Sequence, residues 1–297
     1  MKRANAAMRD GFQHKGPFSV ITVGTGAPRY SPERSGPCAL VHYRRHYFLV
    51  DMGNGTQARL HEANIRVGDL EAFLFTHFHL DHSEEFIPLL INAWLQGQDN
   101  LKIIGPPGVK EYHAFLLSFY KEDIAYRARR TGRPVEKITD IEIKELTGEN
   151  AFELNGVSVR TTEVPHTIYT LAYRFDAGGK SIVISGDLTY SENLIQLARA
   201  ADVVVMDSGG YIRAKQKQGA PQRKGPPRRS GGGNKGRMKA HPSSKDVATM
   251  PSKARVKKLV LTHFAPGVID REATSRVIGE IFKGEVLFGE DLMEVVP

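Results

Sequence analysis

Three histidines and one aspartate lie within six consecutive positions, in the segment His77-Phe78-His79-Leu80-Asp81-His82. Imidazole nitrogens and carboxylate oxygens are donors that a borderline-soft divalent metal prefers. A short loop must direct His77 and His79 to one side and Asp81 and His82 to the other. The spacing therefore predicts that a single loop faces two metal ions. The alternative is a strand end that carries solvated histidines.

Three other polar residues are predicted to end apolar strands. These are His166, which follows Pro165, Asp187 in Ser185-Gly186-Asp187, and His263, which follows the apolar run 259–262. Each residue taken alone is compatible with a purely structural role. Together with the four donors of the loop they make seven, and two divalent ions need about seven or eight if a water is left for chemistry. The sequence therefore predicts that five separate segments converge on one centre.

The elements that must position these residues follow from hydrophobic periodicity. Apolar residues 72–75 and amphipathic residues 83–95 predict a buried strand before the loop and a helix after it. Other predicted strands cover residues 18–24, 39–43, 46–51, 101–105, 152–163, 170–175, 180–185, 202–206, 258–262, 285–288 and 292–295. A further helix is predicted to start at residue 56, and three more are predicted over residues 109–120, 191–199 and 270–282. The order of strands and then helices, twice, predicts an α/β fold in which two mixed sheets pack face to face with helices outside.

Three local features need separate interpretation. Asp51 ends a strand, and it either caps the helix that starts at residue 56 or orients a neighbouring loop through backbone N–H groups. Ser243-Ser244-Lys245-Asp246 predicts a helix that begins with a capping box, and Pro251 is expected to stop or kink it. The charged segment 121–133 is expected to wrap over the surface.

The composition indicates a soluble globular protein. The chain has 297 residues, of which 40% are hydrophobic and 25% are charged. Cys38 is the only cysteine, which excludes an intramolecular disulfide and a thiolate metal cluster. The polar residues 1–16 do not resemble a secretory signal, and no apolar run is long enough to span a membrane. We expect a cytoplasmic protein without a membrane partner.

The net charge of +8 is concentrated in one segment. Residues 209–240 contain ten Lys or Arg and no Asp or Glu, so the rest of the chain is close to neutral. Gly231-Gly232-Gly233, Pro226-Pro227 and a near absence of apolar residues predict a flexible insertion within a single domain that spans residues 1–297. The insertion has two interpretations. It is an arm that attracts phosphate esters, sulfate esters or nucleic acid, or it is a solvated, disordered segment without such a role.

The chain resembles the metallo-β-lactamase-fold hydrolases, within the ribonuclease Z and arylsulfatase-like branch. The residues that carry the resemblance extend over most of the chain: Val23-Gly24-Thr25-Gly26-Ala27, Asp51, the H-x-H-x-D-H loop, Gly105-Pro106, His166, Ser185-Gly186-Asp187 and Leu261-Thr262-His263-Phe264. This resemblance implies a four-layer αββα sandwich that holds two Zn²⁺ ions, with Mn²⁺ or Fe²⁺ as alternatives.

The resemblance also implies a role for each donor. One ion would be bound by His77, His79 and His166 and the other by Asp81, His82 and His263, with Asp187 as the bridge. His79 stands where diiron relatives carry a carboxylate, which favours zinc hydrolysis over oxygen chemistry. The nucleophile would be a hydroxide between the ions, because the metals lower the pKa of bound water from about 15.7 to about 7. Asp81 would both bind a metal and orient this nucleophile.

His241, in His241-Pro242-Ser243-Ser244, resembles the histidine that assists the leaving group in the ribonuclease Z branch. A glutamate pairs with that histidine in the family, and here Asp207 occupies the corresponding place with a shorter reach. A carboxylate partner would fix the tautomer of His241 and raise its pKa toward use as a general acid. The alternative is a surface histidine that follows a flexible segment.

The sequence predicts a metal-dependent hydrolase, most simply a phosphodiesterase with broad tolerance for small-molecule esters. Arylsulfatase, lactonase, β-lactam-hydrolysing and ribonuclease Z-like RNA-processing activities are alternatives on the same centre. His166 and Asp187 are too close in sequence to enclose the flexible arm of the transfer-RNA-processing members, and Ser83-Glu84-Glu85 replaces a glycine-containing continuation. A catalytically silent RNA-binding protein is an alternative of another class, although the complete ligand set argues against it. The resemblance also implies a homodimer.

Overall fold

Two seven-stranded sheets face one another in the computed structural model, which describes residues 12–209, 211 and 240–297. The first sheet has the order β14 (Met293–Val295), β1 (Phe18–Gly24), β2 (Cys38–Tyr43), β3 (His46–Val50), β4 (Leu70–Leu74), β5 (Lys102–Gly105) and β6 (Glu142–Glu145). The second has the order β13 (Glu285–Phe288), β12 (Lys258–Thr262), β11 (Val203–Asp207), β10 (Lys180–Ile184), β9 (Thr170–Ala177), β8 (Val157–Val164) and β7 (Asn150–Leu154).

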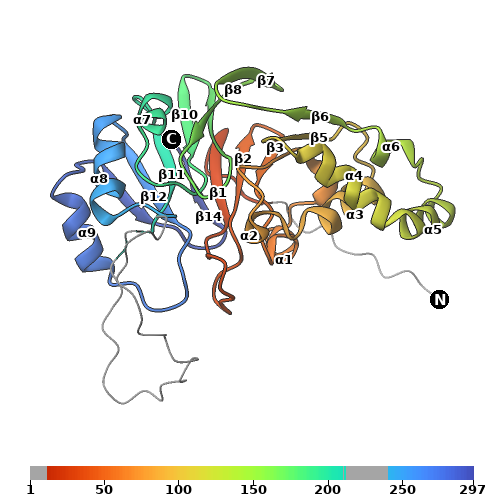
Figure 1. Cartoon of the computed structure of the whole chain (residues 1–297), viewed down its shortest axis with the longest axis horizontal. Coiled ribbons are helices and arrows are strands. Elements are labelled where there is room, and N and C mark those ends of the chain that lie inside the picture. The colour runs from red at the N-terminus through yellow and green to blue at the C-terminus, as the bar shows by residue number, and fades with distance from the viewer. Residues whose placement is uncertain (1–11, 210, 212–239) are drawn as a thin grey trace, which may run out of the picture.

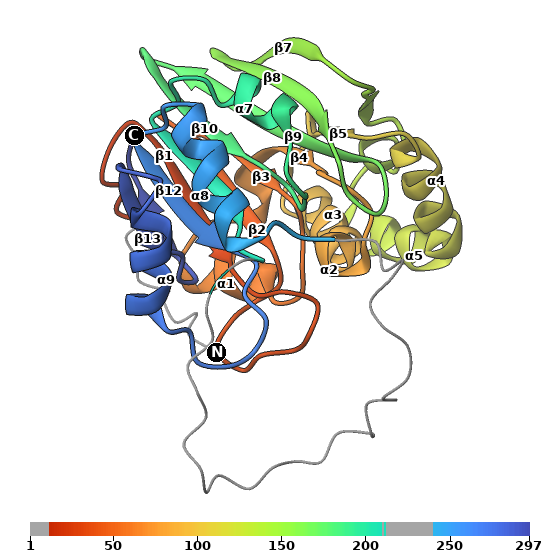
Figure 2. The same cartoon turned by 60° about the vertical axis from the view of Figure 1, so that its left-hand side comes forward.

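Helices cover the outer faces of both sheets (Figures 1 and 2). The first sheet is covered by α1 (Thr56–Glu62), α3 (Phe86–Leu95), α4 (Val109–Phe119) and α5 (Lys121–Thr131), and the short helices α2 (Leu80–Ser83) and α6 (Glu136–Thr139) lie on the same side. The second sheet is covered by α7 (Glu192–Leu197), α8 (Ser244–Lys253) and α9 (Arg271–Gly279). The predicted αββα sandwich is therefore confirmed.

The core between the sheets is apolar and comes from both of them. Phe48 and Leu74 of the first sheet and Phe175 and Val205 of the second belong to one cluster of buried side chains. Strands such as Val203–Asp207 are buried throughout, as expected for parallel strands covered on both faces. This packing holds the two sheets together.

The predicted donors lie at strand ends along one edge of the sandwich. β3, β4 and β5 are parallel to one another, and so are β10, β11 and β12, so the carboxyl ends of these strands meet. Asp51 follows β3, Asp187 follows β10 and His263 follows β12. Residues 77–82, here called the donor-rich loop, follow β4. Polar side chains therefore stand at the place where parallel sheets commonly bind ligands.

Three local predictions were wrong in detail. The predicted helix over residues 83–95 begins only at Phe86, as α3, because Ser83 ends the short helix α2 and Glu84 and Glu85 lie between the two helices. Residues 152–163 contain a hairpin of β7 and β8, because Asn155 and Gly156 adopt the positive φ angles (47° and 84°) of a tight turn. Helix α8 continues past Pro251 and ends at Lys253. Residues 121–131 of the charged segment form the helix α5, in which Ile124 is the one buried residue, so this segment lies on the surface as expected.

The described residues contain no helix that combines the length and the apolarity required to cross a membrane. The capping box that opens α8 was predicted correctly, since the Ser243 hydroxyl accepts from the Asp246 amide and the Asp246 carboxylate accepts from the Ser243 amide. The predicted flexible basic insertion at 209–240 falls almost entirely on residues 210 and 212–239, which lie outside the described residues.

Candidate metal centre

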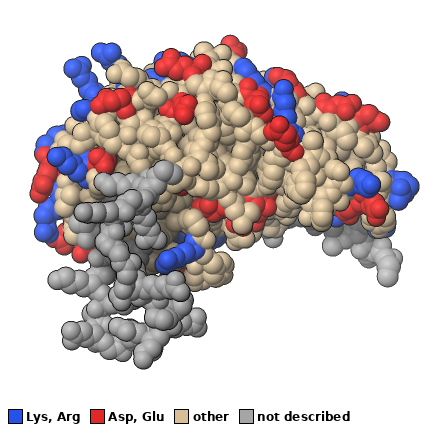
Figure 3. Space-filling view, viewed as in Figure 1, with Lys and Arg blue, Asp and Glu red and all other residues tan. Residues whose placement is uncertain are grey.

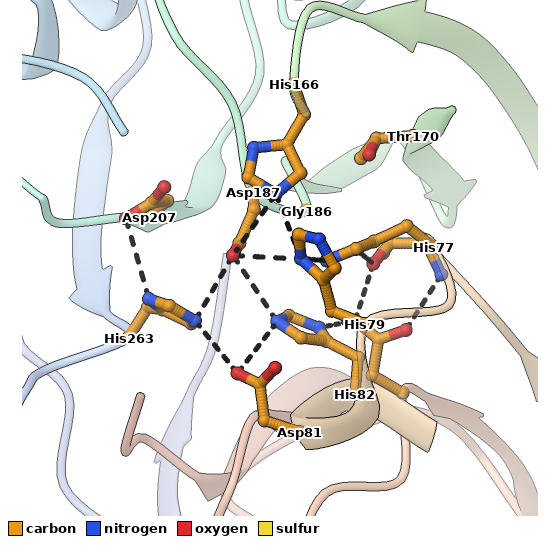
Figure 4. A network of polar contacts seen from close by, with 12 residues as sticks. His77, His79, Asp81, His82, His166, Thr170, Gly186, Asp187, Asp207 and His263 are labelled. Atoms are coloured by element: carbon orange, nitrogen blue, oxygen red, sulfur yellow. Dashed lines mark hydrogen bonds and ion pairs between the residues drawn. The ribbon is translucent and has the colours of Figure 1, made fainter. Parts of the chain in front are cut away.

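All seven predicted donors converge on one edge of the sandwich (Figure 4). His77, His79, His166 and Asp187 each present a ligand atom within 4.8 Å of the others, and Asp81, His82 and His263 do the same. The first half of the chain contributes the loop after β4 and the short helix α2 that follows it, and the second half contributes three strand ends. The centre therefore forms only when the two sheets are correctly placed against one another.

In the first group the His79 spacings are close to those of a tetrahedral site, and the Asp187 spacings are wider. His79 Nδ1 lies 3.1 Å from His77 Nε2 and 3.2 Å from His166 Nε2. Asp187 Oδ2 lies 4.0 Å from His77 Nε2 and 3.9 Å from His166 Nε2. A tetrahedral zinc ion with ligands at about 2.0–2.1 Å requires ligand atoms about 3.3 Å apart. The observed spacing surrounds a position that such an ion would fit.

The second group is more regular. His82 Nε2 lies 3.6 Å from Asp81 Oδ2 and 3.5 Å from Asp187 Oδ1. His263 Nε2 lies 3.4 Å from Asp81 Oδ2 and 3.2 Å from Asp187 Oδ2. Asp187 thus contacts both groups and lies between them, as Figure 4 shows.

Three atoms of the second group are buried without a hydrogen-bond partner. They are Asp81 Oδ2, His82 Nε2 and His263 Nε2. A buried polar atom without a partner is costly, so such atoms normally mark strain or a bound group. Because these three atoms face a common point and are of types that bind zinc, the residues fit a divalent metal.

Asp51 holds the donor-rich loop from beneath. Its Oδ2 accepts from His82 Nδ1 at 2.8 Å and from the Thr76 hydroxyl at 2.7 Å, and its Oδ1 accepts from the Thr76 amide at 2.7 Å. The Thr76 oxygen in turn accepts from His77 Nδ1 at 2.9 Å. These bonds place the protons of both imidazoles on Nδ1 and turn Nε2 toward the centre. Asp51 therefore orients the loop and does not cap α1, whose N-cap is Gly55.

The two remaining histidines of the first group are also held through their outer nitrogens. Thr167 Oγ1 lies 3.1 Å from His79 Nε2, and the Ala240 carbonyl accepts from His166 Nδ1 at 2.8 Å. Such contacts fix the ring and its tautomer. Neither Thr167 nor the Ala240 backbone was predicted from the sequence, because no spacing rule links a carbonyl at position 240 to a histidine at 166.

The charges at the centre are strongly coupled. Burial lowers the pKa of the His77 imidazole far below its ordinary value, which keeps it neutral and able to bind a metal. Burial also opposes charge on His82, but Asp187 and Asp51 outweigh it and raise the pKa of that imidazole. Burial opposes ionisation of Asp187, yet His263 and His82 hold the pKa of its carboxyl well below the usual range. An anionic Asp187 is thus maintained at the middle of the site.

His241 lies beside the centre with the partner that was predicted for it. Its Nδ1 lies 2.7 Å from Asp207 Oδ2, and this hydrogen bond raises the pKa of the His241 imidazole. The His241 ring lies 5.1 Å from the His263 ring and 5.8 Å from the His166 ring. The His241 side chain is 36% exposed whereas that of Asp207 is 1% exposed. The imidazole therefore stands between the donors and solvent.

Another group of ligand-type residues lies on the outer face of the first sheet. The rings of His14 and His42 stack with centroids 3.4 Å apart and planes 7° apart, so their lone pairs run parallel and do not converge. The buried Glu294 carboxylate accepts from the Ser19 hydroxyl at 2.6 Å and from the Lys15 amide at 2.7 Å. We therefore assign this cluster to hydrogen bonding.

Comparison with known proteins agrees with the geometry. Residues 46–264 match the family described as the beta-lactamase superfamily domain. The chain is 31% identical over 286 residues to a protein named ribonuclease Z from Mycobacterium bovis (strain BCG / Pasteur 1173P2), which covers 94% of this chain and 98% of the relative.

Two solved structures share the fold. The metallo-beta-lactamase fold protein YhfI from Bacillus subtilis superposes with a TM-score of 0.70 at 17% identity, covering 95% of this chain and 100% of that one. Human tRNase Z, short form, superposes with a TM-score of 0.66 at 20% identity, covering 94% and 98%. The chain is a metal-dependent hydrolase and belongs to the metallo-β-lactamase-fold superfamily as a ribonuclease Z-like member.

Proposed function

We propose that this chain is a dinuclear zinc phosphodiesterase that cleaves phosphodiester bonds in RNA. The observation that carries the proposal is the pair of donor groups that share Asp187, with spacings close to those of two tetrahedral zinc sites. Relatives named ribonuclease Z, similar over nearly their whole length, support RNA as the substrate class.

Each donor has a place in the proposed centre. His77 Nε2, His79 Nδ1 and His166 Nε2 would hold one ion, and Asp81, His82 Nε2 and His263 Nε2 would hold the other, with Asp187 as the bridge. The mixed nitrogen and oxygen set suits zinc, and Mn²⁺ and Fe²⁺ are the alternatives. Two bound ions would supply a water of lowered pKa and stabilise the charge that develops on the phosphate.

The protein's own groups would complete the chemistry. Asp81 lies at the rim of the centre, where its side chain is 12% exposed, and would orient the attacking water by accepting a proton or a hydrogen bond. His241, charged through its bond to Asp207, would donate a proton from Nε2 to the departing ribose oxygen. These roles match an in-line displacement, with the nucleophile held by one set of groups and the leaving oxygen by another.

A phosphodiesterase acting on small-molecule esters is the second candidate. The segment from His166 to Asp187 holds only the hairpin of β9 and β10, so no arm that could grip a large RNA projects between them. On the face shown in Figure 3, acidic and basic side chains of the described residues are interspersed. The Lys/Arg-rich segment 209–240, left open between an arm for esters or nucleic acid and a solvated segment, falls almost entirely outside the described residues.

A side-by-side assay separates the candidates. The purified protein is offered a precursor RNA with a 3′ extension, a chromogenic phosphodiester, an aryl sulfate, a lactone and a β-lactam. We expect metal-dependent cleavage of the RNA at a defined position and slower hydrolysis of the chromogenic diester. Hydrolysis of the small diester without RNA cleavage would favour the second candidate. RNA binding without cleavage of any substrate, with zinc saturating, would favour a silent binding protein.

A further inference from the structure

The centre is divided between two sheets, and something must set the distance between its halves. His77, His79, Asp81 and His82 follow β4 of the first sheet, and the other donors follow strands of the second. The apolar side chains that pack between the sheets make non-directional contacts. Ligand atoms must be placed within a few tenths of an ångström for a tetrahedral site, so directional contacts are needed.

Two hydrogen bonds cross from β9 to the start of the donor-rich loop. The Tyr173 hydroxyl donates to the Phe75 carbonyl at 2.7 Å, and the Leu171 amide donates to the Thr76 carbonyl at 2.9 Å. Phe75 and Thr76 are the two residues immediately before His77. Two successive carbonyls of one sheet are therefore bound by two residues of the other, directly beneath a donor.

Tyr173 is the side chain in this contact. It is fully buried in the middle of β9, and its ring belongs to the apolar cluster between the sheets. A phenylalanine would fill the same volume, so packing alone does not account for the hydroxyl. The hydroxyl instead satisfies a buried carbonyl that would otherwise lack a partner, which gives the bond a definite direction.

Tyr173 is connected to two of the other donors, to His166 along β9 and to Asp187 through the pairing of β9 with β10. β9 begins at Thr170, four residues after His166, and Tyr173 pairs with Ile184 of β10, three residues before Asp187. The halves approach closely at this point, since a Cβ on Gly186 would lie 3.0 Å from the Thr76 Cβ. A shift at Tyr173 would thus move His166 and Asp187 relative to His77.

We propose that the Tyr173 hydroxyl is a positioning device that fixes the separation of the two half-sites and thereby tunes metal affinity. This inference rests on the proposed two-metal centre, since it assigns a residue to its assembly. The effect should fall mainly on the ion held by His77, His79, His166 and Asp187, because that group spans both sheets next to the Tyr173 contact. Tyr173 touches neither metal nor substrate, so its role is to position and not to catalyse.

Replacement of Tyr173 by Phe, with Tyr47→Phe as the matched control, tests the proposal. Tyr47 lies on β3, and its hydroxyl is 2.7 Å from His14 Nε2 on the outer face of the first sheet, so the control loses a similar bond far from the centre. Zinc affinity is measured by competition with a chromogenic chelator, and the absorption spectrum of the Co²⁺-loaded protein reports the geometry of the sites. Thermal unfolding of the metal-free proteins checks that both variants fold.

We expect Tyr173→Phe to weaken the binding of one zinc ion about tenfold and to alter the Co²⁺ spectrum. Its kcat should fall with little change in KM. Tyr47→Phe should keep the affinity and spectrum of the unchanged protein, even if its unfolding temperature falls equally. If the unsubstituted protein binds two zinc ions and Tyr173→Phe binds both with the same affinity, this inference is overturned and the proposed function still stands. If the unchanged protein binds no zinc, the proposed function and the inference both fail.

Discussion

At the scale of single residues, the centre is a set of donors whose orientation is fixed by other side chains. Asp51 holds His82 directly and His77 through Thr76, Thr167 holds His79, and Ala240 holds His166. The donors could be predicted from the sequence because they are unusual residues at strand ends. Among the groups that hold them, the sequence left Asp51 open between capping a helix and orienting the donor-rich loop. Thr167 and the Ala240 carbonyl could not be predicted, because threonine and a backbone carbonyl are common and acquire this role only through three-dimensional proximity.

The His241–Asp207 pair gives a prediction at this scale. If His241 donates a proton to the leaving oxygen, its removal should matter only when the leaving group needs that proton. We expect His241→Ala to lower kcat on RNA by about 10²- to 10⁴-fold. The same variant should lose far less on a diester with a 4-nitrophenolate leaving group, which departs as an anion.

The measurement is kcat on both substrates with zinc saturating. Asp207→Asn is the companion variant, and it should lower kcat on RNA in the same direction because the hydrogen bond that raises the His241 pKa is weakened. Equal losses on the two substrates would show that His241 acts on binding or on metal geometry and not as the acid.

At the scale of elements, most strand positions followed the sequence closely, whereas β6, the turn between β7 and β8 and the helix boundaries near the centre did not. β1 and β12 have the predicted bounds because alternating or continuous apolar residues leave little choice of register. The break between α2 and α3 was missed because its cause is a distant contact. The Glu85 carboxylate accepts from the amides of Gly55 and Gln57 at 2.6 and 2.8 Å, which satisfies the first turn of α1.

Glu85 therefore joins the segment after the donor-rich loop to the turn that follows Asp51. We expect Glu85→Ala to lower the free energy of unfolding by about 1.5–3 kcal/mol, as for hydrogen bonds to a charged group. Denaturant unfolding of the metal-free protein measures this change. Glu111→Ala, in the first turn of α4, is the control and should change stability by less than about 0.5 kcal/mol. A similarly small change in both variants would refute the proposed link.

At the scale of the whole molecule, the first and second halves of the chain contact each other at the metal centre and also at a second place, where the C-terminal strand joins the first sheet. β14, near the C-terminus, pairs with β1, and Glu294 on β14 binds Lys15 and Ser19 near the other end of the described chain. The face-to-face packing of the sheets was predictable from the order of strands and helices. The pairing of the last strand with the first was not, because sequence order does not specify which edge a terminal strand joins.

Glu294 gives a prediction of pH dependence. Burial opposes ionisation of Glu294, but bonds from Ser19, Lys15 and His14 outweigh it and lower the pKa of this carboxyl below its ordinary value of 4.5. A depressed pKa contributes stability above 4.5, and the contribution is lost as the pH falls through the lower, folded-state pKa. Glu294→Gln should therefore be less stable than the unchanged protein at pH 7, and the difference should shrink below pH 4.5.

Unfolding midpoints of the two proteins measured across this pH range check the expectation. Glu153→Gln, an exposed residue on β7, serves as the control and should differ from the unchanged protein by less than about 0.5 kcal/mol at pH 7. A Glu294→Gln difference that stays constant down to acid pH would mean that the carboxylate charge is not what stabilises the contact.

The proposed function depends on seven donors from both sheets that meet around two metal ions and enable phosphodiester cleavage. The decisive experiment combines two measurements. Elemental analysis gives the metal content per chain, and RNA cleavage is assayed before and after chelation. We expect two zinc ions per chain, loss of cleavage when they are removed and recovery when zinc is restored. Cleavage that persists in metal-free protein, or a folded protein that retains no divalent metal at saturating zinc, would contradict this account.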